Sequence, residues 1–177
     1  MERQPCKLPD TIKQAVGAVK GCLINAKNIN SCNEVMDQAM KKAGAEFVGW
    51  GLDRRVYGFN GCVVKVARTT MNRPANIVEK KIYDEADPSI KEFFAPVEDA
   101  DEEDFWITMP RAVVNELHSS DREVMARELR QELDKRGWGC VDLKWNNVGL
   151  LDEKPKITNY GMGLNRCFIR QRGPKGY

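Results

Sequence analysis

The sequence predicts an α+β fold, because helix-like and strand-like patterns occupy separate stretches of the chain. Apolar residues recur at helical spacing between residues 10 and 44. From Phe47 the pattern changes to short apolar runs separated by glycines, which is typical of antiparallel strands joined by turns. Further helical and strand-like stretches follow in the second half of the chain.

The first stretch predicts two helices. Asp10 can cap the first helix, and Ser31 with Glu34 forms a capping-box pattern for the second. Gly44 is suited to end the second helix. Their apolar faces are expected to be core without chemistry; they contain Ile12, Val16, Val19, Leu23, Val35, Met36, Ala39 and Met40.

The middle of the chain predicts three strands and a helix. The segment FVGWGLDRRVYGFNGCVVKVA (47–67) reads as strand, glycine turn, strand, tight turn and strand, and NIVEKKIYDEA (76–86) reads as a helix. The acidic stretch EDADEED (98–104) is expected to be a solvated hairpin; the alternative is attraction of a basic partner. An apolar strand, Phe105 to Met109, follows it.

The last part predicts one helix and two short strands. Ser120 with Glu123 repeats the capping-box pattern, and this helix is expected to end near Gly137. The segment VDLKWNNVGLLDEKPKIT (141–158) then gives a polar loop and two short strands separated by a polar turn.

Composition limits the functional class. The chain has 177 residues, 42% of them hydrophobic, which suits one domain that can have two lobes. Its net charge of +2 gives no reason to expect a nucleic-acid partner. Six cysteines without a C-x-x-C pair, and a single histidine, make a Cys/His zinc site unexpected. The cysteines are interpreted as reduced thiols. With no secretory signal and no bilayer-spanning run, a cytoplasmic location without a membrane partner is predicted.

Several residues carry possible chemistry, each with a plainer alternative. Gly49 and Gly51 would let a backbone approach phosphates, although they also suit a plain hairpin turn, and Arg54 stands where G-x-G-x-x-G has its third glycine. Lys65 lies in an apolar run and should meet an anion, unless its strand is at an edge and the amine reaches solvent. Glu79 on the next helix is the candidate partner, although most helix glutamates are simply exposed.

Asp142 and Asn147 lie five positions apart around L-K-W-N. An aspartate can orient a hydroxyl and accept its proton, and an asparagine oxygen can bind magnesium. Taken alone, both residues are common turn formers.

Taken in order, these segments resemble the protein kinases across residues 47–164. The shared features are a glycine-containing turn, V-V-K-V-A, a helix glutamate, D-L-K-x-x-N and x-Y-G. The resemblance is greatest to compact kinase-like proteins of bacteria and viruses. It implies a minimal kinase-like fold: an N-terminal helical extension (1–46), then a domain (47–177) with an antiparallel-sheet N-lobe (about 47–109), a hinge (109–112) and a reduced helical C-lobe (113–177).

The resemblance also implies roles, with ATP and Mg²⁺ or Mn²⁺ as cofactors. Lys65 would hold the phosphates and pair with Glu79, Asp142 would be the catalytic aspartate, and Lys144 would neutralise the transferring phosphate. Metal would bind Asn147 and Asn159. The remaining nucleotide contacts would come from the glycine turn, its flanking valine and the hinge: Gly49, Gly51, Val56, Met109, Pro110, Arg111 and Ala112.

Three departures from the kinase pattern bear on activity. Cys140 and Val141 replace the His-Arg before the catalytic aspartate, which removes an arginine that could receive an activation-loop phosphate. Asn159 replaces the metal-binding aspartate of D-F-G, and an amide brings magnesium only a dipole. Little sequence follows Gly161, so a long activation segment is not expected.

Three functions stay open. The first is an ATP-dependent kinase acting on protein Ser/Thr hydroxyls, weakened at the metal site by Asn159. The second is a pseudokinase, a nucleotide-binding or protein-interaction module. The third is a small-molecule phosphotransferase; the D-L-K sequence favours protein substrates over this one.

Overall fold

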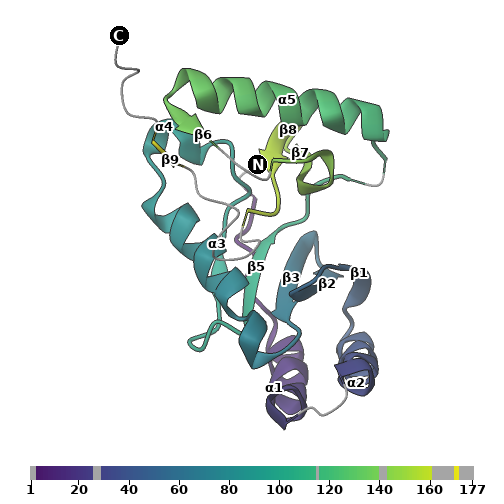
Figure 1. Ribbon diagram of the computed structural model, residues 1–177. Helices are drawn as coiled ribbons and strands as arrows, with labels where there is room; N and C mark the ends of the chain where they lie inside the picture. The colour runs from purple at the N-terminus through teal and green to yellow at the C-terminus, as the bar shows by residue number, and fades with distance from the viewer. Residues whose placement is uncertain (1–2, 26–28, 115, 140–142, 161–169, 172–177) are drawn as a thin grey trace. The chain divides into compact units, whose positions relative to one another are not determined.

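The structure, a computed structural model, describes residues 3–25, 29–114, 116–139, 143–160 and 170–171. The chain divides into two compact units. Unit 1 comprises Met1–Ile77 with Val97–Arg111, and unit 2 comprises Val78–Pro96 with Ala112–Tyr177. The predicted α+β class is confirmed, because helices accompany a five-stranded antiparallel sheet (Figure 1).

The sheet of unit 1 has the strand order β1-β2-β3-β5-β4, and every neighbouring pair is antiparallel. Its strands are β1 Glu46–Trp50, β2 Arg54–Phe59, β3 Cys62–Ala67, β4 Asp99–Ala100 and β5 Trp106–Pro110. The predicted tight turn joins β2 to β3 through Asn60 and Gly61, both at positive φ. Strand β4 falls within the acidic stretch and pairs with β5, so the predicted hairpin is present.

Helices α1 (Asp10–Asn25) and α2 (Ile29–Lys42) lie side by side (Figure 1). Gly44, at a φ of 86°, follows α2 as predicted. Helix α2 already includes Ser31, so the predicted cap position of this residue is wrong. One face of the sheet forms a core with both helices; this core includes Ile12, Val16, Val19, Met36, Met40, Tyr57, Val64 and Val66.

A partly buried polar cluster joins α2 to the same face of the sheet. Arg55 Nε and the Tyr57 hydroxyl both donate to Asp37 Oδ1, over 2.9 and 2.7 Å. Burial, and next the Asp37 carboxylate, raise the pKa of Tyr57, so this hydroxyl stays a hydrogen-bond donor at neutral pH. Residues 55 and 57 of β2 therefore face α2, and residues 54, 56 and 58 face the opposite side of the sheet.

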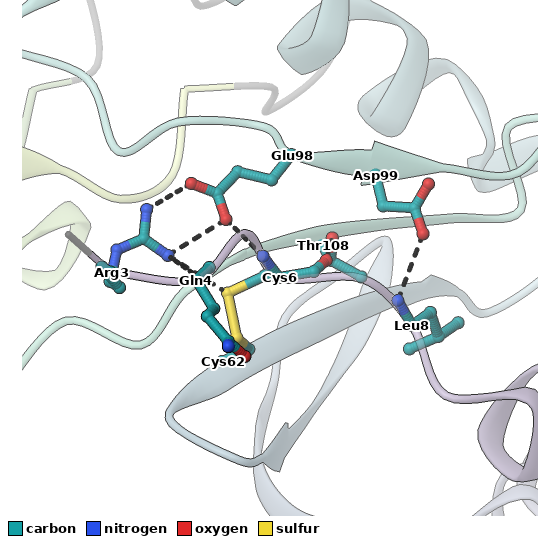
Figure 2. The surroundings of a disulfide bond; sticks show 8 residues. All are labelled: Arg3, Gln4, Cys6, Leu8, Cys62, Glu98, Asp99 and Thr108. Atoms are coloured by element: carbon teal, nitrogen blue, oxygen red, sulfur yellow. Dashed lines mark hydrogen bonds and ion pairs between the residues drawn. A yellow bond between two sulfur atoms is a disulfide. The ribbon is translucent and has the colours of Figure 1, made fainter.

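A disulfide holds the N-terminal segment on the sheet. Cys6 is bonded to Cys62 of β3, and the Thr108 hydroxyl of β5 donates to the Cys6 carbonyl over 2.5 Å (Figure 2). Carboxylates of the acidic hairpin bind the same segment: Glu98 accepts from the Cys6 backbone N–H, and Asp99 accepts from the Leu8 backbone N–H over 3.1 Å. These carboxylates therefore have protein partners as well as solvent.

The prediction that the cysteines are reduced thiols is wrong for Cys6 and Cys62. Cys32 keeps a buried thiol, as predicted, and Cys140 and Cys167 lie outside the described residues. Disulfides are rare in the cytoplasm, so this bond does not support the predicted cytoplasmic location. That location stays a prediction. Within the described part of the chain, no helix is long and apolar enough to cross a membrane.

Unit 2 begins within helix α3, which runs from Pro74 to Glu85 where a helix was predicted. Its main helix, α5, opens after His118 and already includes Ser120, so the predicted cap position is wrong here as well. The predicted end of this helix is confirmed, since Gly137 has a φ of 78°. The remaining elements are α4 Pro88–Lys91, α5 Ser119–Lys135, β6 Trp138–Gly139, β7 Val148–Leu151, β8 Lys154–Ile157 and β9 Arg170–Gln171.

The two strands predicted after the polar loop form the β7–β8 hairpin. A methyl group on Gly149 of β7 would lie 3.0 Å from the Ala112 Cβ and 3.0 Å from the Val113 carbonyl oxygen. Val113 also exchanges both backbone hydrogen bonds with Leu150. Glycine at 149 thus lets the segment after β5 pack tightly on the hairpin.

Candidate functional site

The predicted site residues divide between the two units. Unit 1 contains Gly49, Gly51, Val56, Lys65, Met109, Pro110 and Arg111. Unit 2 contains Glu79, Ala112, Lys144, Asn147 and Asn159, and Asp142 lies outside the described residues. An ion pair of Lys65 with Glu79 would join the two units and stays a prediction.

The glycine turn connects β1 to β2. The Gly51 N–H donates to the Arg54 carbonyl over 2.8 Å, and Arg68 Nη1 donates to the Gly51 and Leu52 carbonyls over 3.3 Å. Among the residues that the structure describes, none has a heavy atom within 4 Å of a Cβ atom built on Gly49 or Gly51. Packing among the described residues therefore does not require glycine at either position.

Lys65 is buried on the face of the sheet that lies away from α1 and α2. Lys65 is 6% exposed, and Val56 of β2 is its cross-strand partner. Strand β3 has β2 on one side and β5 on the other, so the edge-strand alternative is wrong. A buried ammonium needs an anion, and the same face also carries Val63 and Met109, which pair with one another.

Two residues of the predicted hinge have no unused backbone N–H. Met109 and Pro110 are the last residues of β5, and proline has no N–H. The Arg111 N–H already donates to the Gly61 carbonyl over 3.0 Å. Within the predicted hinge, Pro110 therefore has no backbone N–H to offer a base, and the N–H of Arg111 is already used.

The Arg111 side chain forms a feature that the sequence did not indicate. Its guanidinium forms an ion pair with Glu46 of β1 across Gly58 of β2. A Cβ atom on Gly58 would lie 2.8 Å from Arg111 Nη1, so glycine makes room for the pair. Because Glu46 and Gly58 are register partners, this pair lies on the face that carries Val56 and Lys65.

In unit 2, Glu79 is fixed by the x-Y-G segment. Glu79 is fully buried, and its Oε1 accepts from the backbone N–H of Tyr160 over 3.1 Å. Tyr160 is anchored in turn, since its hydroxyl donates to the Ala95 carbonyl over 2.7 Å. Its ring packs on Phe94, with 4.9 Å between the two ring centroids. The helix glutamate and the x-Y-G segment, 81 residues apart in sequence, therefore meet.

The two predicted metal ligands also come together. Asn159 Nδ2 donates to Asn147 Oδ1 over 3.2 Å, and the Asn147 carbonyl accepts from the Thr158 N–H over 2.7 Å. Asn147, only 4% exposed, ends a short 3₁₀ turn, Trp145–Asn147. Lys144 precedes this turn and is exposed.

This donor set does not fit a firmly held Mg²⁺. Magnesium in proteins is usually bound by one or two carboxylates together with phosphate oxygens, whereas both described ligands are amides. One amide oxygen, Oδ1 of Asn147, already accepts a hydrogen bond from the other amide. Among the described residues, no three His, Cys, Asp or Glu side chains gather as a metal site.

No protein-family model and no curated protein sequence matches the chain. Among solved structures, the chain is similar to the kinase domain of PknI from M. tuberculosis, with a TM-score of 0.43 and 16% identity over 68% of this chain. The chain covers 58% of that kinase domain, little more than half of its length. At this TM-score the likeness assigns neither fold nor function, and only the residues described above support a function.

Proposed function

We propose that the chain is a protein-kinase-like protein that binds ATP. The observation that supports this most strongly is the meeting, in unit 2, of a helix glutamate with the x-Y-G segment, one residue beyond the Asn147–Asn159 pair. In unit 1, a buried lysine and an open glycine turn belong to one sheet. The ordered motifs of the sequence give these parts the roles of phosphate binding and lysine positioning.

In this proposal the sheet of unit 1 acts as the N-lobe and unit 2 as a reduced C-lobe. Lys65 and the Gly49–Gly51 turn bind the phosphates, Glu79 positions Lys65, and the base lies near Val56 and the 109–112 segment. The backbone N–H of Tyr160 holds the Glu79 carboxyl group in place, and a carboxyl group held in this way can orient a lysine side chain.

The pair of amides, Asn147 and Asn159, favours a pseudokinase, that is, a nucleotide-binding or protein-interaction module. With Asn159 donating to Asn147, no charge on these two side chains attracts a divalent cation. ATP would then be bound without efficient transfer, and the ATP-bound surface would be available to a protein partner.

Phosphotransfer to a protein Ser/Thr hydroxyl is the second candidate, and the D-L-K-x-x-N segment favours it. Asp142 would accept the hydroxyl proton while the hydroxyl oxygen attacks the γ-phosphorus. The bond from the γ-phosphorus to the bridging oxygen would break, and ADP would leave. Lys144, exposed beside the 3₁₀ turn, would neutralise charge on the transferred phosphoryl group.

Transfer from γ-labelled ATP with Mg²⁺ or Mn²⁺ distinguishes the two candidates. The experiment compares the wild type, Asn159→Asp, and the double variant Asn159→Asp/Asp142→Ala as the control. A pseudokinase gives no transfer in the wild type, and gain of transfer in Asn159→Asp would identify a kinase site disabled at one ligand. Efficient transfer by the wild type would identify an active kinase. The same variants are titrated with ATP by calorimetry, and absence of ATP binding in every one of them would refute the proposal as a whole.

A further inference from the structure

Tyr160 is held in place from two sides within unit 2. It is 1% exposed, and its hydroxyl donates to the Ala95 carbonyl over 2.7 Å. Its ring packs on Phe94 with an angle of 58° between the ring planes. A phenylalanine, which the D-F-G pattern has at this position, would fill the same space against Phe94 but has no hydroxyl to donate. The hydrogen bond therefore fixes Tyr160 in a way that packing alone does not.

The acceptor of this hydrogen bond is itself fixed. The Ala95 N–H donates to the Ile157 carbonyl over 3.0 Å, and the Ile157 N–H donates to the Phe93 carbonyl over 2.8 Å. Residues 93–95 are thus paired with the last residue of β8. Tyr160 returns to the same residues, and only two residues separate it from Ile157. A connection this short has little conformational freedom once both of its ends are fixed.

This attachment determines where the backbone N–H of Tyr160 points. The N–H donates to Oε1 of Glu79 over 3.1 Å, and Glu79 is fully buried on helix α3. Because the donor belongs to the backbone, a movement of residue 160 moves the donor with it. Residues 93–95, Tyr160 and Glu79 therefore form one connected series of contacts, and the Tyr160 hydroxyl lies in the middle of it.

We propose that the Tyr160 hydroxyl is a lock that keeps the x-Y-G segment and the Glu79 carboxyl group in the arrangement that binds ATP. This inference rests on the proposed function, in which Glu79 positions Lys65. It deepens that function by naming how the site is regulated: the site is held in one arrangement and is not switched between two. Tyr160 is a positioning residue, because it acts on the nucleotide through Glu79.

Loss of the lock lets the segment populate arrangements that bind phosphates poorly. The apparent Kd for ATP then rises by the inverse of the fraction of chains that remain in the binding arrangement. One hydrogen bond is worth about three- to tenfold in such an equilibrium. The base is spared, since the proposed function places it near Val56 and the 109–112 segment.

Two measurements on Tyr160→Phe test the lock. Amide hydrogen exchange, followed by NMR at position 160, measures how often the segment opens, and we expect it to be about three- to tenfold faster than in the wild type. Calorimetric titration then compares ATP with adenosine, which has the same base and no phosphates. Kd for ATP should rise by about three- to tenfold, and Kd for adenosine should stay at the wild-type value.

The matched control is Tyr57→Phe. Tyr57 is also 1% exposed, and its hydroxyl donates to Asp37 over the same distance of 2.7 Å, on the face of the sheet that packs on α2. This variant loses a comparable hydrogen bond in unit 1, so it reports the effect of lower stability alone. Its Kd for ATP should stay at the wild-type value, and its exchange at position 160 should be slower than in Tyr160→Phe.

The fold of each variant is checked by circular dichroism. If Tyr160→Phe does not fold, Phe94→Leu takes its place with the same expected direction, because it loosens the ring contact and keeps the hydroxyl. Wild-type exchange at position 160, or an unchanged Kd for ATP, in the folded variant would overturn the inference and leave the proposed function standing. Equal losses of ATP and adenosine affinity, or the same loss of ATP affinity in Tyr57→Phe, would show a structural role only and would also overturn it. No ATP binding by the wild type would overturn the proposed function and the inference with it.

Discussion

Replacing Cys62 with serine is expected to lower the free energy of unfolding of unit 1 by about 4 kcal/mol. The disulfide closes a loop with a sequence separation of 56 residues between Cys6 and Cys62. The loop-entropy relation for an unfolded chain gives about 14 cal/mol/K for a loop of this length, or about 4 kcal/mol at 25 °C. The Cα atoms are 5.7 Å apart, inside the usual range for disulfides.

Urea unfolding followed by circular dichroism measures this loss. The matched control is Cys32→Ser, the same change of atoms at a buried cysteine outside the disulfide. We expect Cys62→Ser to destabilise by several kcal/mol more than this control, and reduction of the wild type to give a similar loss. A difference below about 1 kcal/mol between Cys62→Ser and the control, with no effect of a reductant, would refute the disulfide and the role given to the N-terminal segment.

Three further results are expected. Gly149→Ala should destabilise the protein by about 1–3 kcal/mol in urea unfolding, since its methyl group would lie 3.0 Å from a backbone oxygen. Gly58→Ala should cost under about 1 kcal/mol, because its methyl group displaces only the exposed ends of side chains. Equal losses in the two variants would contradict this reasoning. Burial raises the pKa of Glu98, but hydrogen bonds from the Arg3 side chain and from the Cys6 backbone N–H outweigh burial, so the pKa is lowered overall. Its contribution to stability is therefore present above the ordinary pKa of 4.5 and is lost as pH falls through the lower folded value, and Glu98→Gln should remove this loss from acid titrations of stability. Tyr160→Phe should cost about 1–3 kcal/mol in thermal or urea unfolding, because the Ala95 carbonyl loses its buried donor; a neutral result would show that water replaces the hydroxyl.

Most secondary-structure elements could be predicted from the sequence because burial of one face leaves a local pattern. The run that became β3 alternates between a face packed on the helices and a face carrying Lys65, and the turn at Asn60 and Gly61 has the residues that positive φ requires. Helix starts were less predictable. Ser31 and Ser120 each stand three residues before a glutamate, yet both lie inside helices, since the same spacing also occurs within a first turn.

Long-range pairings could not be predicted from local patterns. Six cysteines allow many pairings, and nothing near Cys6 indicates Cys62 as its partner. The acidic hairpin was expected to be solvated, but Glu98 binds a backbone N–H 92 residues away. Arg111 pairs with Glu46 across Gly58 of the strand between them, a contact between residues 65 apart in the sequence.

The candidate site shows the same division. The loop containing Asn147 and the segment containing Asn159 flank one hairpin, so their meeting follows from the short connection between β7 and β8. Arg54 was visible only as a missing glycine, because a local pattern does not show the strand register that places it diagonally beside Lys65. The sequence shows that Pro110 has no backbone N–H. It does not show that the Arg111 N–H is used by the Gly61 carbonyl.

Calorimetric titration of ATP into the wild type and into Lys65→Met tests the central claim most directly. ATP binding through a kinase-like site predicts one site per chain in the wild type, and Kd at least about tenfold weaker in Lys65→Met. Lys13→Met, on helix α1, is the control that should leave Kd unchanged. Absence of binding in the folded wild type, or equal affinity in the wild type and Lys65→Met, would contradict the claim.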